Sequence, residues 1–195
     1  MRKLGILVGG ALALTACAQT PPPPVDLNNP LMAPGFLAQA ASGDQFEIQS
    51  SQLALQASQN AAVRNFANMM ISDHTRLSQA MGAAAASARV PPPAPTLLPA
   101  QQAMLDQLRS AGTGYGFDQA YQAAQIQAHQ GALSLMQNYA TSGDVAALRT
   151  AAGQAVPTVQ SHLSMAQALV IAPPPPPPAP PPPPPPPVRR SGERG

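Results

Sequence analysis

The sequence predicts an all-α protein: a four-helix bundle built from two helical hairpins, flanked by disordered proline-rich segments. Three observations support this prediction. Ala and Gln dominate residues 36–170, so helix propensity is high almost throughout. Runs of β-branched residues, which favour strands, are absent from the same region. Proline clusters and short polar turns divide the region into helix-length segments, and short connections favour antiparallel neighbours.

The first 16 residues have the pattern of a bacterial signal peptide. Two basic residues at positions 2 and 3 precede an apolar stretch, Leu4 to Leu14, that is too short to span a bilayer as a helix. The following LTAC, which ends at Cys17, is similar to the lipobox of bacterial lipoproteins. This resemblance implies that Cys17 becomes the lipidated first residue of the mature protein. We therefore expect a membrane anchor at the N-terminus.

The residue after Cys17 bears on location. It is Ala18 and not Asp, which in such lipoproteins favours the outer membrane, with the domain facing the periplasm. Ordinary secretion is the alternative, because cleavage after Ala18 also fits a small-residue site. Cys17 is the only cysteine of the chain. An intramolecular disulfide and a cysteine-based zinc site are therefore excluded.

Proline-rich segments flank the predicted helical domain, which covers residues 36–171. Residues 17–35 combine the lipid anchor with a stiff proline-rich spacer. Residues 172–195 form a tail in which a nearly continuous proline run, typical of polyproline II, precedes three arginines: Arg189, Arg190 and Arg194. Two interpretations of the tail stay open. Its arginines contact an anionic component of the envelope, or it is a solvated low-complexity segment.

The charge of the chain excludes one class of partner. The formal net charge is +2, and it includes the two basic residues of the signal segment. The remaining positive excess lies in the last seven residues, so the helical domain itself is close to neutral. A nucleic-acid-binding domain would carry a basic face. We therefore expect no nucleic-acid partner.

The first half of the domain contains two long helices and one short helix. The first covers about residues 36–58 and ends at SQN, whose polar side chains favour a cap for the next helix. The second covers about residues 61–88 and ends at VPPPAP, because the residue before a proline disfavours the α conformation. A short helix is predicted over residues 100–110, before the flexible turn SAGTGYG.

The second half contains two more long helices. The third begins near Phe117, with Asp118 in its first turn, where the positive end of the helix dipole favours an acid. It ends before TSGD, and Asp144 is predicted to cap the fourth helix, which continues to about residue 171. Pro157 lies inside that helix and frees the carbonyl of Gly153. The resulting kink either aims His162 inwards or is a tolerated bend.

Each long helix carries one titratable residue on an apolar or small-residue face. These residues are Glu47, His74, His129 and His162. Two of the histidines begin nearly identical octets, HTRLSQAM and HLSMAQAL. At one height in the bundle, the four would form a mononuclear site of three imidazoles and a carboxylate, which suits zinc, or copper given the neighbouring methionines. The alternative is a hydrogen-bonded polar core, with a buried Glu47–His74 pair that fixes helix register.

Several pieces of the chain together resemble one family of bacterial envelope proteins. They include DH at residues 73–74, FDQAYQAAQIQAH at residues 117–129 and VPTVQSH at residues 156–162. Over residues 36–170 they are similar to the domain of unknown function 4142 family. That resemblance implies a ferritin-like bundle and an envelope location, and it implies no specific activity.

Most catalytic chemistry is excluded by the residues present. A ferritin-like di-iron site needs a Glu-x-x-His motif on each of two helices, but the residues three before His74 and His162 are Ile and Val. Only Glu47 is expected to be an inward carboxylate, because Asp73 lies about 100° around its helix from His74 and can pair with Arg76. Neither a nucleophile elbow nor a phosphate-binding loop is present.

The sequence therefore leaves three functional hypotheses. The first is a non-catalytic binding or structural module of the envelope. The second is a metal-binding or metal-buffering protein that uses zinc or copper, and the third is a ferritin-like oxidoreductase. Asp118 and Tyr121, near a helix start, are assigned to capping and to packing of the hairpin. Converging donor atoms would favour a metal site, whereas different heights or separate pairs would favour a structural core.

Overall fold

A computed structural model describes residues 26–93 and 96–173 of the chain. The signal segment, the lipidation site Cys17, most of the N-terminal spacer and the arginine-tipped proline tail lie outside the described residues. What was expected of these segments therefore stays a prediction. None of the described helices is long and apolar enough to cross a membrane.

The described residues form five α-helices and no strand, as the all-α prediction requires. The predicted short helix is present, and the first long helix begins a few residues earlier than expected. The helices are α1 (Ala33–Ala57), α2 (Ala61–Ser87), α3 (Pro99–Ser110), α4 (Tyr115–Ser142) and α5 (Ala146–Ala168).

One of the two predicted helix caps is present. The side chain of Asn60 accepts hydrogen bonds from the backbone of Ala62 and Val63, so the predicted cap at the start of α2 is confirmed. The predicted cap at Asp144 is wrong. Val145 is the N-cap of α5 and makes no side-chain cap bond. The carboxylate of Asp144 accepts a hydrogen bond from Tyr139 at 2.8 Å instead, which ties the end of α4 to the turn that follows.

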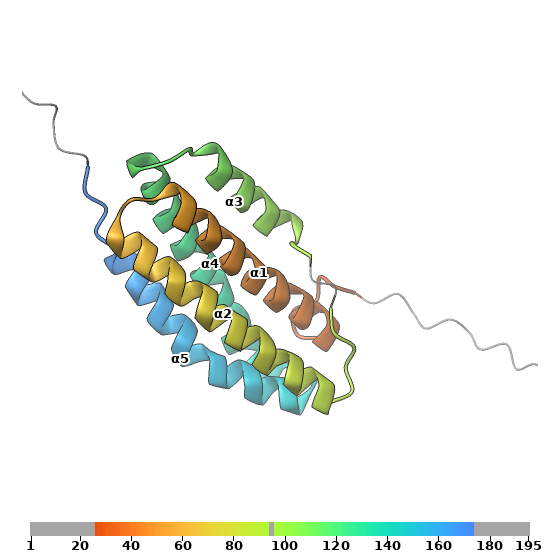
Figure 1. Cartoon of the computed structure of the whole chain (residues 1–195). Helices are drawn as coiled ribbons and strands as arrows, with labels where there is room; N and C mark the ends of the chain where they lie inside the picture. Colours follow the sequence, from red (N-terminus) through yellow and green to blue (C-terminus); the bar gives the residue numbers. More distant parts are fainter. Residues whose placement is uncertain (1–25, 94–95, 174–195) are drawn as a thin grey trace, which may run out of the picture.

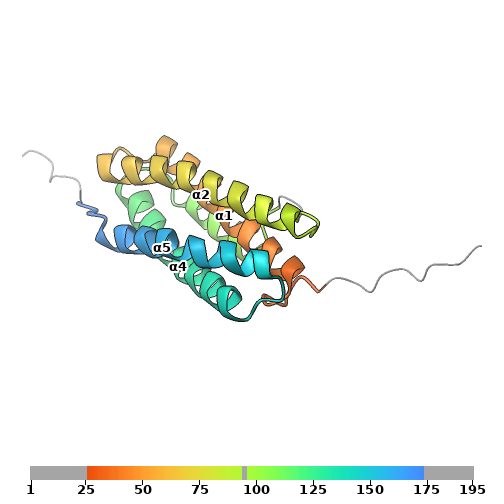
Figure 2. The same cartoon turned by 90° about the horizontal axis from the view of Figure 1, so that it is seen from below.

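The four long helices lie side by side in a helical bundle (Figures 1 and 2). Helices α1 and α2 form one hairpin, and α4 and α5 form the other. The hairpins meet through contacts of α2 with α5 and of α1 with α4. Helix α3 lies outside this group and packs on α1 and α4, as Figure 1 shows.

Two apolar clusters fill the interior. One lies towards the α1–α2 turn and contains Phe46, Ala54, Ala57, Val63, Phe66, Ala67, Met70, Leu105, Leu108, Phe117, Tyr121 and Ala166. The other lies towards the α4–α5 turn and contains Ala33, Phe36, Leu37, Ala40, Met81, Ala85, Met136, Tyr139, Leu148, Ala152 and Ala155. On each long helix the two clusters occupy opposite ends. The middle turns of all four helices therefore meet in a separate layer, and that layer is polar.

Candidate metal centre

The polar layer between the two apolar clusters contains every histidine of the chain. Helix α1 contributes two carboxylates, and α2, α4 and α5 contribute one histidine each. All five residues of the layer are buried: Asp44, Glu47, His74, His129 and His162. Burying so many titratable groups costs free energy unless each is paired or hydrogen-bonded. The partners of each group therefore decide what the layer can do.

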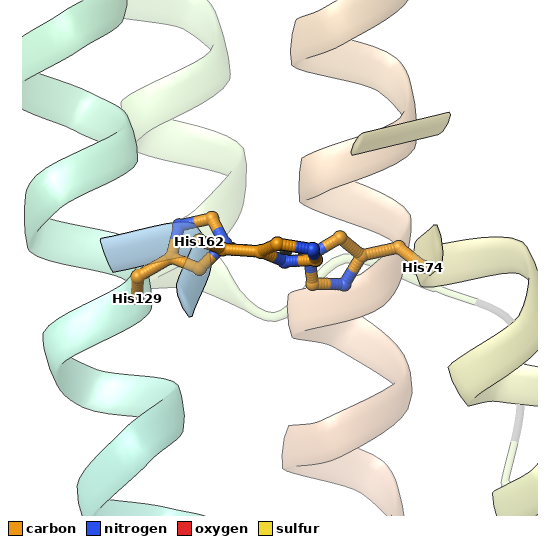
Figure 3. A group of neighbouring side chains, drawn as sticks. All are labelled: His74, His129 and His162. Carbon is orange, nitrogen blue, oxygen red and sulfur yellow. Dashed lines mark hydrogen bonds between the residues drawn. The ribbon is translucent and has the colours of Figure 1, made fainter. Parts of the chain in front are cut away.

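The three histidines form a compact triangle. The centroids of their rings lie 5.3–5.4 Å apart in all three pairs. Figure 3 shows the rings of His74, His129 and His162 pointing towards one another from three helices. One nitrogen from each ring can be chosen so that all three lie within 4.8 Å of one another. The histidines thus converge at one height, as the metal-site hypothesis requires of them.

In each ring, one nitrogen is held by an acceptor at the edge of the triangle. His74 Nδ1 lies 2.8 Å from Asp44 Oδ1, and His162 Nε2 lies 2.9 Å from Asp73 Oδ2. His129 Nδ1 lies 2.8 Å from the backbone carbonyl of Gln125, one helical turn earlier. A carbonyl or carboxylate oxygen only accepts, so each held nitrogen carries the proton and donates it. Metal-binding histidines in proteins are usually oriented by such partners.

The other nitrogen of each ring is left for the centre of the triangle. His74 Nε2 and His129 Nε2 lie 3.4 Å apart, and His162 Nδ1 is buried without a hydrogen-bond partner in the structure. When the outer nitrogens carry the protons, these inner nitrogens are lone pairs that face one another. A proton or a metal ion between the rings would stabilise such an arrangement. Two nitrogen ligands of a tetrahedral zinc ion, at about 2.1 Å each, lie about 3.4 Å apart.

In the metal-free centre, protonation of one ring places a proton between the inner nitrogens. Burial by itself lowers the pKa of His74, but its hydrogen bond to Asp44 and the negative charges of Glu47 and Asp44 outweigh burial and raise that pKa above 6.5. Burial and the charge of His74 lower the pKa of His129 to about 3. Burial also lowers the pKa of His162. A charged His74 can therefore donate an Nε2–H hydrogen bond to Nε2 of neutral His129.

Glu47 belongs to the layer but not to the triangle. Its Oε1 lies 3.5 Å from Nδ1 of His129, the outer nitrogen of that ring, and its Oε2 is buried without a hydrogen-bond partner in the structure. The group of converging donor atoms comprises the three histidines without Glu47. Burial raises the pKa of Glu47 to about 7, against the opposing effect of the charge on His74. The fourth predicted ligand thus adjoins the site from the side of His129.

Two carboxylates have roles that the sequence pattern does not predict. Asp44 lies three residues before Glu47 and so on the same face of α1. It pairs with His74, where a Glu47–His74 pair was the expected alternative, and its second oxygen accepts a hydrogen bond from Ser78 at 2.7 Å. Asp73 does pair with Arg76, but its other oxygen also reaches His162. The expectation of a single inward carboxylate is therefore wrong.

The remaining predicted residues lie away from the triangle. The hydroxyl of Tyr121 is 2.8 Å from that of Ser51, in a buried contact between α4 and α1. Asp118 is buried in the first turn of α4, as expected. Pro157 lies inside α5, which continues to Ala168. These residues serve packing and helix structure rather than the centre.

One of the comparisons with known proteins found a match. The profile of the family described as Domain of unknown function (DUF4142) matches residues 19–169, which include all five helices up to the last residue of α5 and the whole polar layer. No curated protein and no solved structure matches the chain. Because the match covers most of the sequence, the chain belongs to the family of domains of unknown function DUF4142.

Proposed function

We propose that this protein binds one transition-metal ion through His74, His129 and His162. The observation that supports this most strongly is that the two nitrogens of each ring have different surroundings. One nitrogen is held by an acceptor, and the other is directed to a common centre. A purely structural polar layer would need only the outer pairs. It would leave no reason for the three inner nitrogens to converge in a buried place, with that of His162 lacking a hydrogen-bond partner in the structure.

The donor set favours zinc or copper. Three neutral imidazoles with an open fourth position are the ligand set of several zinc sites, and imidazole also binds copper well. Magnesium and calcium prefer oxygen ligands, which the triangle does not offer. Asp44 and Asp73 act as partners that orient the ligand rings rather than as ligands. Their negative charge also favours a bound cation.

The proposed setting is the bacterial envelope. The four long helices would be a ferritin-like four-helix bundle to which α3 is added. A lipid on Cys17 would hold the bundle at the outer membrane, facing the periplasm, with the proline segments controlling its reach. Metal binding or buffering then replaces the broader hypothesis of an envelope binding module. The lipobox-like LTAC supports this setting, as does the envelope location that the resemblance to the domain of unknown function 4142 family implies.

Metal content and thermal melting test the proposal. The mature chain, made with C17S so that no lipid is attached, would be stripped of metal and offered zinc, copper or iron(II). We expect one zinc or copper ion per chain and a melting temperature that rises when the ion binds. At a ligand concentration 100 times the dissociation constant, the added stability is about 2.7 kcal/mol.

Two variants separate a ligand from a structural residue. H129A should lose the ion and the rise in melting temperature. S51A, which removes a buried hydrogen bond of α1 elsewhere in the bundle, should lower stability and keep the ion. Absence of stoichiometric metal, two ions per chain, or full metal content in H129A would each contradict a mononuclear three-histidine centre. If no stoichiometric metal binds, or if H129A keeps its full metal content, the polar layer is a structural part of the core.

A further inference from the structure

A cavity of about 600 Å³ adjoins the polar layer. Its walls come from α1 and α4, with contributions from α2, α5 and the start of α3. Among its lining residues are His74, whose inner nitrogen faces the triangle, and Glu47, whose Oε2 is buried without a partner in the structure. The volume lies within the range of small-molecule sites, about 300–1,000 Å³. The cavity therefore reaches His74, one of the three proposed ligands, and is large enough for a small molecule.

Two helical glycines keep the cavity wide. Gly43 of α1 and Gly131 of α4 both line it. A Cβ atom added at either would meet no atom within 4 Å beyond the helix's own backbone. Packing does not require glycine at these positions, and glycine in a helix costs about 1 kcal/mol relative to alanine. The two glycines thus cost stability while leaving space in the cavity.

The charges of the cavity select against anions. Its ionisable lining residues are Asp44, Glu47 and His74, and none of its lining residues is a lysine or an arginine. Amide side chains and apolar groups make up much of the remainder, including Gln127, Met104 and Leu135. An anionic ligand would meet two carboxylates without a compensating cation other than the centre itself. An uncharged molecule with an apolar body fits these walls better.

We propose that this cavity holds an uncharged heteroaromatic molecule whose ring nitrogen occupies the fourth coordination position of the metal. The inference rests on the proposed metal centre, since three histidines leave one position of a tetrahedral ion open. The metal would select the nitrogen donor, and the apolar walls would bind the rest of the ring system. The carboxylates would exclude acids of the same shape.

Cobalt(II) provides the readout, because it occupies zinc sites and its visible absorption reports its ligands. The cobalt-loaded mature chain with C17S would be titrated with 4-phenylimidazole and with its para-carboxylate analogue, which has the same shape and a negative charge. We expect 4-phenylimidazole to shift the visible bands and to bind at least tenfold more tightly than the analogue. Equal or tighter binding of the analogue would overturn the selection by charge.

Glycine variants test the location. G131L and G43L should fill the cavity, keep cobalt uptake and weaken 4-phenylimidazole at least tenfold. G82L is the matched control, because Gly82 is also a helical glycine with no atom within 4 Å of an added Cβ but does not line this cavity. Undiminished binding in both filled variants would overturn the inference. A protein that takes up no cobalt overturns the metal centre as well, whereas cobalt uptake without a response to 4-phenylimidazole overturns only the ligand site.

Discussion

Asp73 Oδ2 lies 2.9 Å from Nε2 of His162, on α5, while the next residue of the chain, His74, is part of the same triangle. Two consecutive residues of α2 therefore have different roles at the triangle. His74 offers its own nitrogen to the centre, and Asp73 orients the ring of His162. The contact between α2 and α5 thus determines the position of two of the three proposed ligands.

This relationship predicts the effect of D73N. Asparagine keeps the shape of the side chain but removes the negative charge that favours and orients the donating ring of His162. Loss of such a partner typically weakens metal affinity about 10–100-fold. Isothermal titration with zinc would measure the change. The fold should persist, because the helices and both apolar clusters are unchanged.

D106N is the control for D73N. Asp106 forms an exposed pair with Arg109 on α3, away from the triangle, so the same chemical change should leave zinc affinity unaltered. Equal affinities of wild type and D73N would show that Asp73 has no orienting role.

Zinc affinity should rise with pH, because the ion replaces the proton that His74 holds. The pKa of His74 is raised by Asp44 and its neighbours despite burial, so this ring stays protonated to higher pH than an ordinary histidine. Binding that releases one proton strengthens by about tenfold per pH unit below that pKa. Competition titrations between pH 5.5 and 8 would measure the slope.

D44N tests the cause of this pH dependence. Without the carboxylate, burial dominates and the pKa of His74 falls. The variant should therefore bind zinc more weakly at high pH. Its zinc affinity should also change less steeply with pH between pH 5.5 and 6.5. An unchanged slope would assign the released proton to another group.

The stability of the metal-free protein should depend on pH through Glu47. Its folded-state pKa of about 7 exceeds the ordinary 4.5, so the folded chain holds this proton more tightly than the unfolded chain. The resulting stabilisation is complete below pH 4.5 and is lost as the pH rises through 7. E47Q removes it. The free energy of unfolding of wild type minus that of E47Q should fall by on the order of 3 kcal/mol between pH 4.5 and 7.5.

Urea unfolding of both proteins across this range measures the difference. The lowered pKa of His129 acts in the opposite direction, because the folded protein loses stability as the pH falls below 6.5. The wild-type profile therefore contains both effects, and only its difference from the E47Q profile isolates Glu47. A difference that does not change with pH would show that Glu47 titrates as an exposed carboxyl.

The sequence could predict the helices and three of the residues at the centre. Helix length and breaks follow from local signals such as the cap at Asn60 and the prolines after residue 90, and the structure agrees to within a few residues. The inward faces of His74, His129 and His162 followed from helical periodicity. Their common height was only a hypothesis, because it depends on how far each helix slides along its neighbours, which no local pattern specifies.

The carboxylates show where sequence reasoning stops. Helical spacing excluded Asp73 from the face of His74, and correctly so, but Asp73 meets a histidine of a different helix. A residue about 100° from the inward direction points at the neighbouring helix, and the identity of that neighbour is a property of the bundle. Asp44 had a usable signal in its three-residue spacing from Glu47. Its selection of His74 over His129 again depends on packing between helices.

Substitutions beside the α4–α5 turn should lower the stability of the protein without changing its metal affinity. The rings of Tyr139 and Phe36 stack with centroids 3.8 Å apart, and the hydroxyl of Tyr139 donates to Asp144. Y139F keeps the stacked ring and removes only the hydrogen bond, so we expect a loss of about 1 kcal/mol. Y139A also empties the ring position and should cost about 3–5 kcal/mol.

Urea unfolding of the metal-free variants, followed by zinc titration, tests this separation. Both variants should bind zinc as tightly as wild type under conditions where they are folded, because Tyr139 belongs to the apolar cluster beside the α4–α5 turn and not to the polar layer. The stabilisation that zinc adds should then be equal in wild type and Y139F. A smaller zinc contribution in Y139F would mean that the end of α4 and the position of His129 are coupled along the helix.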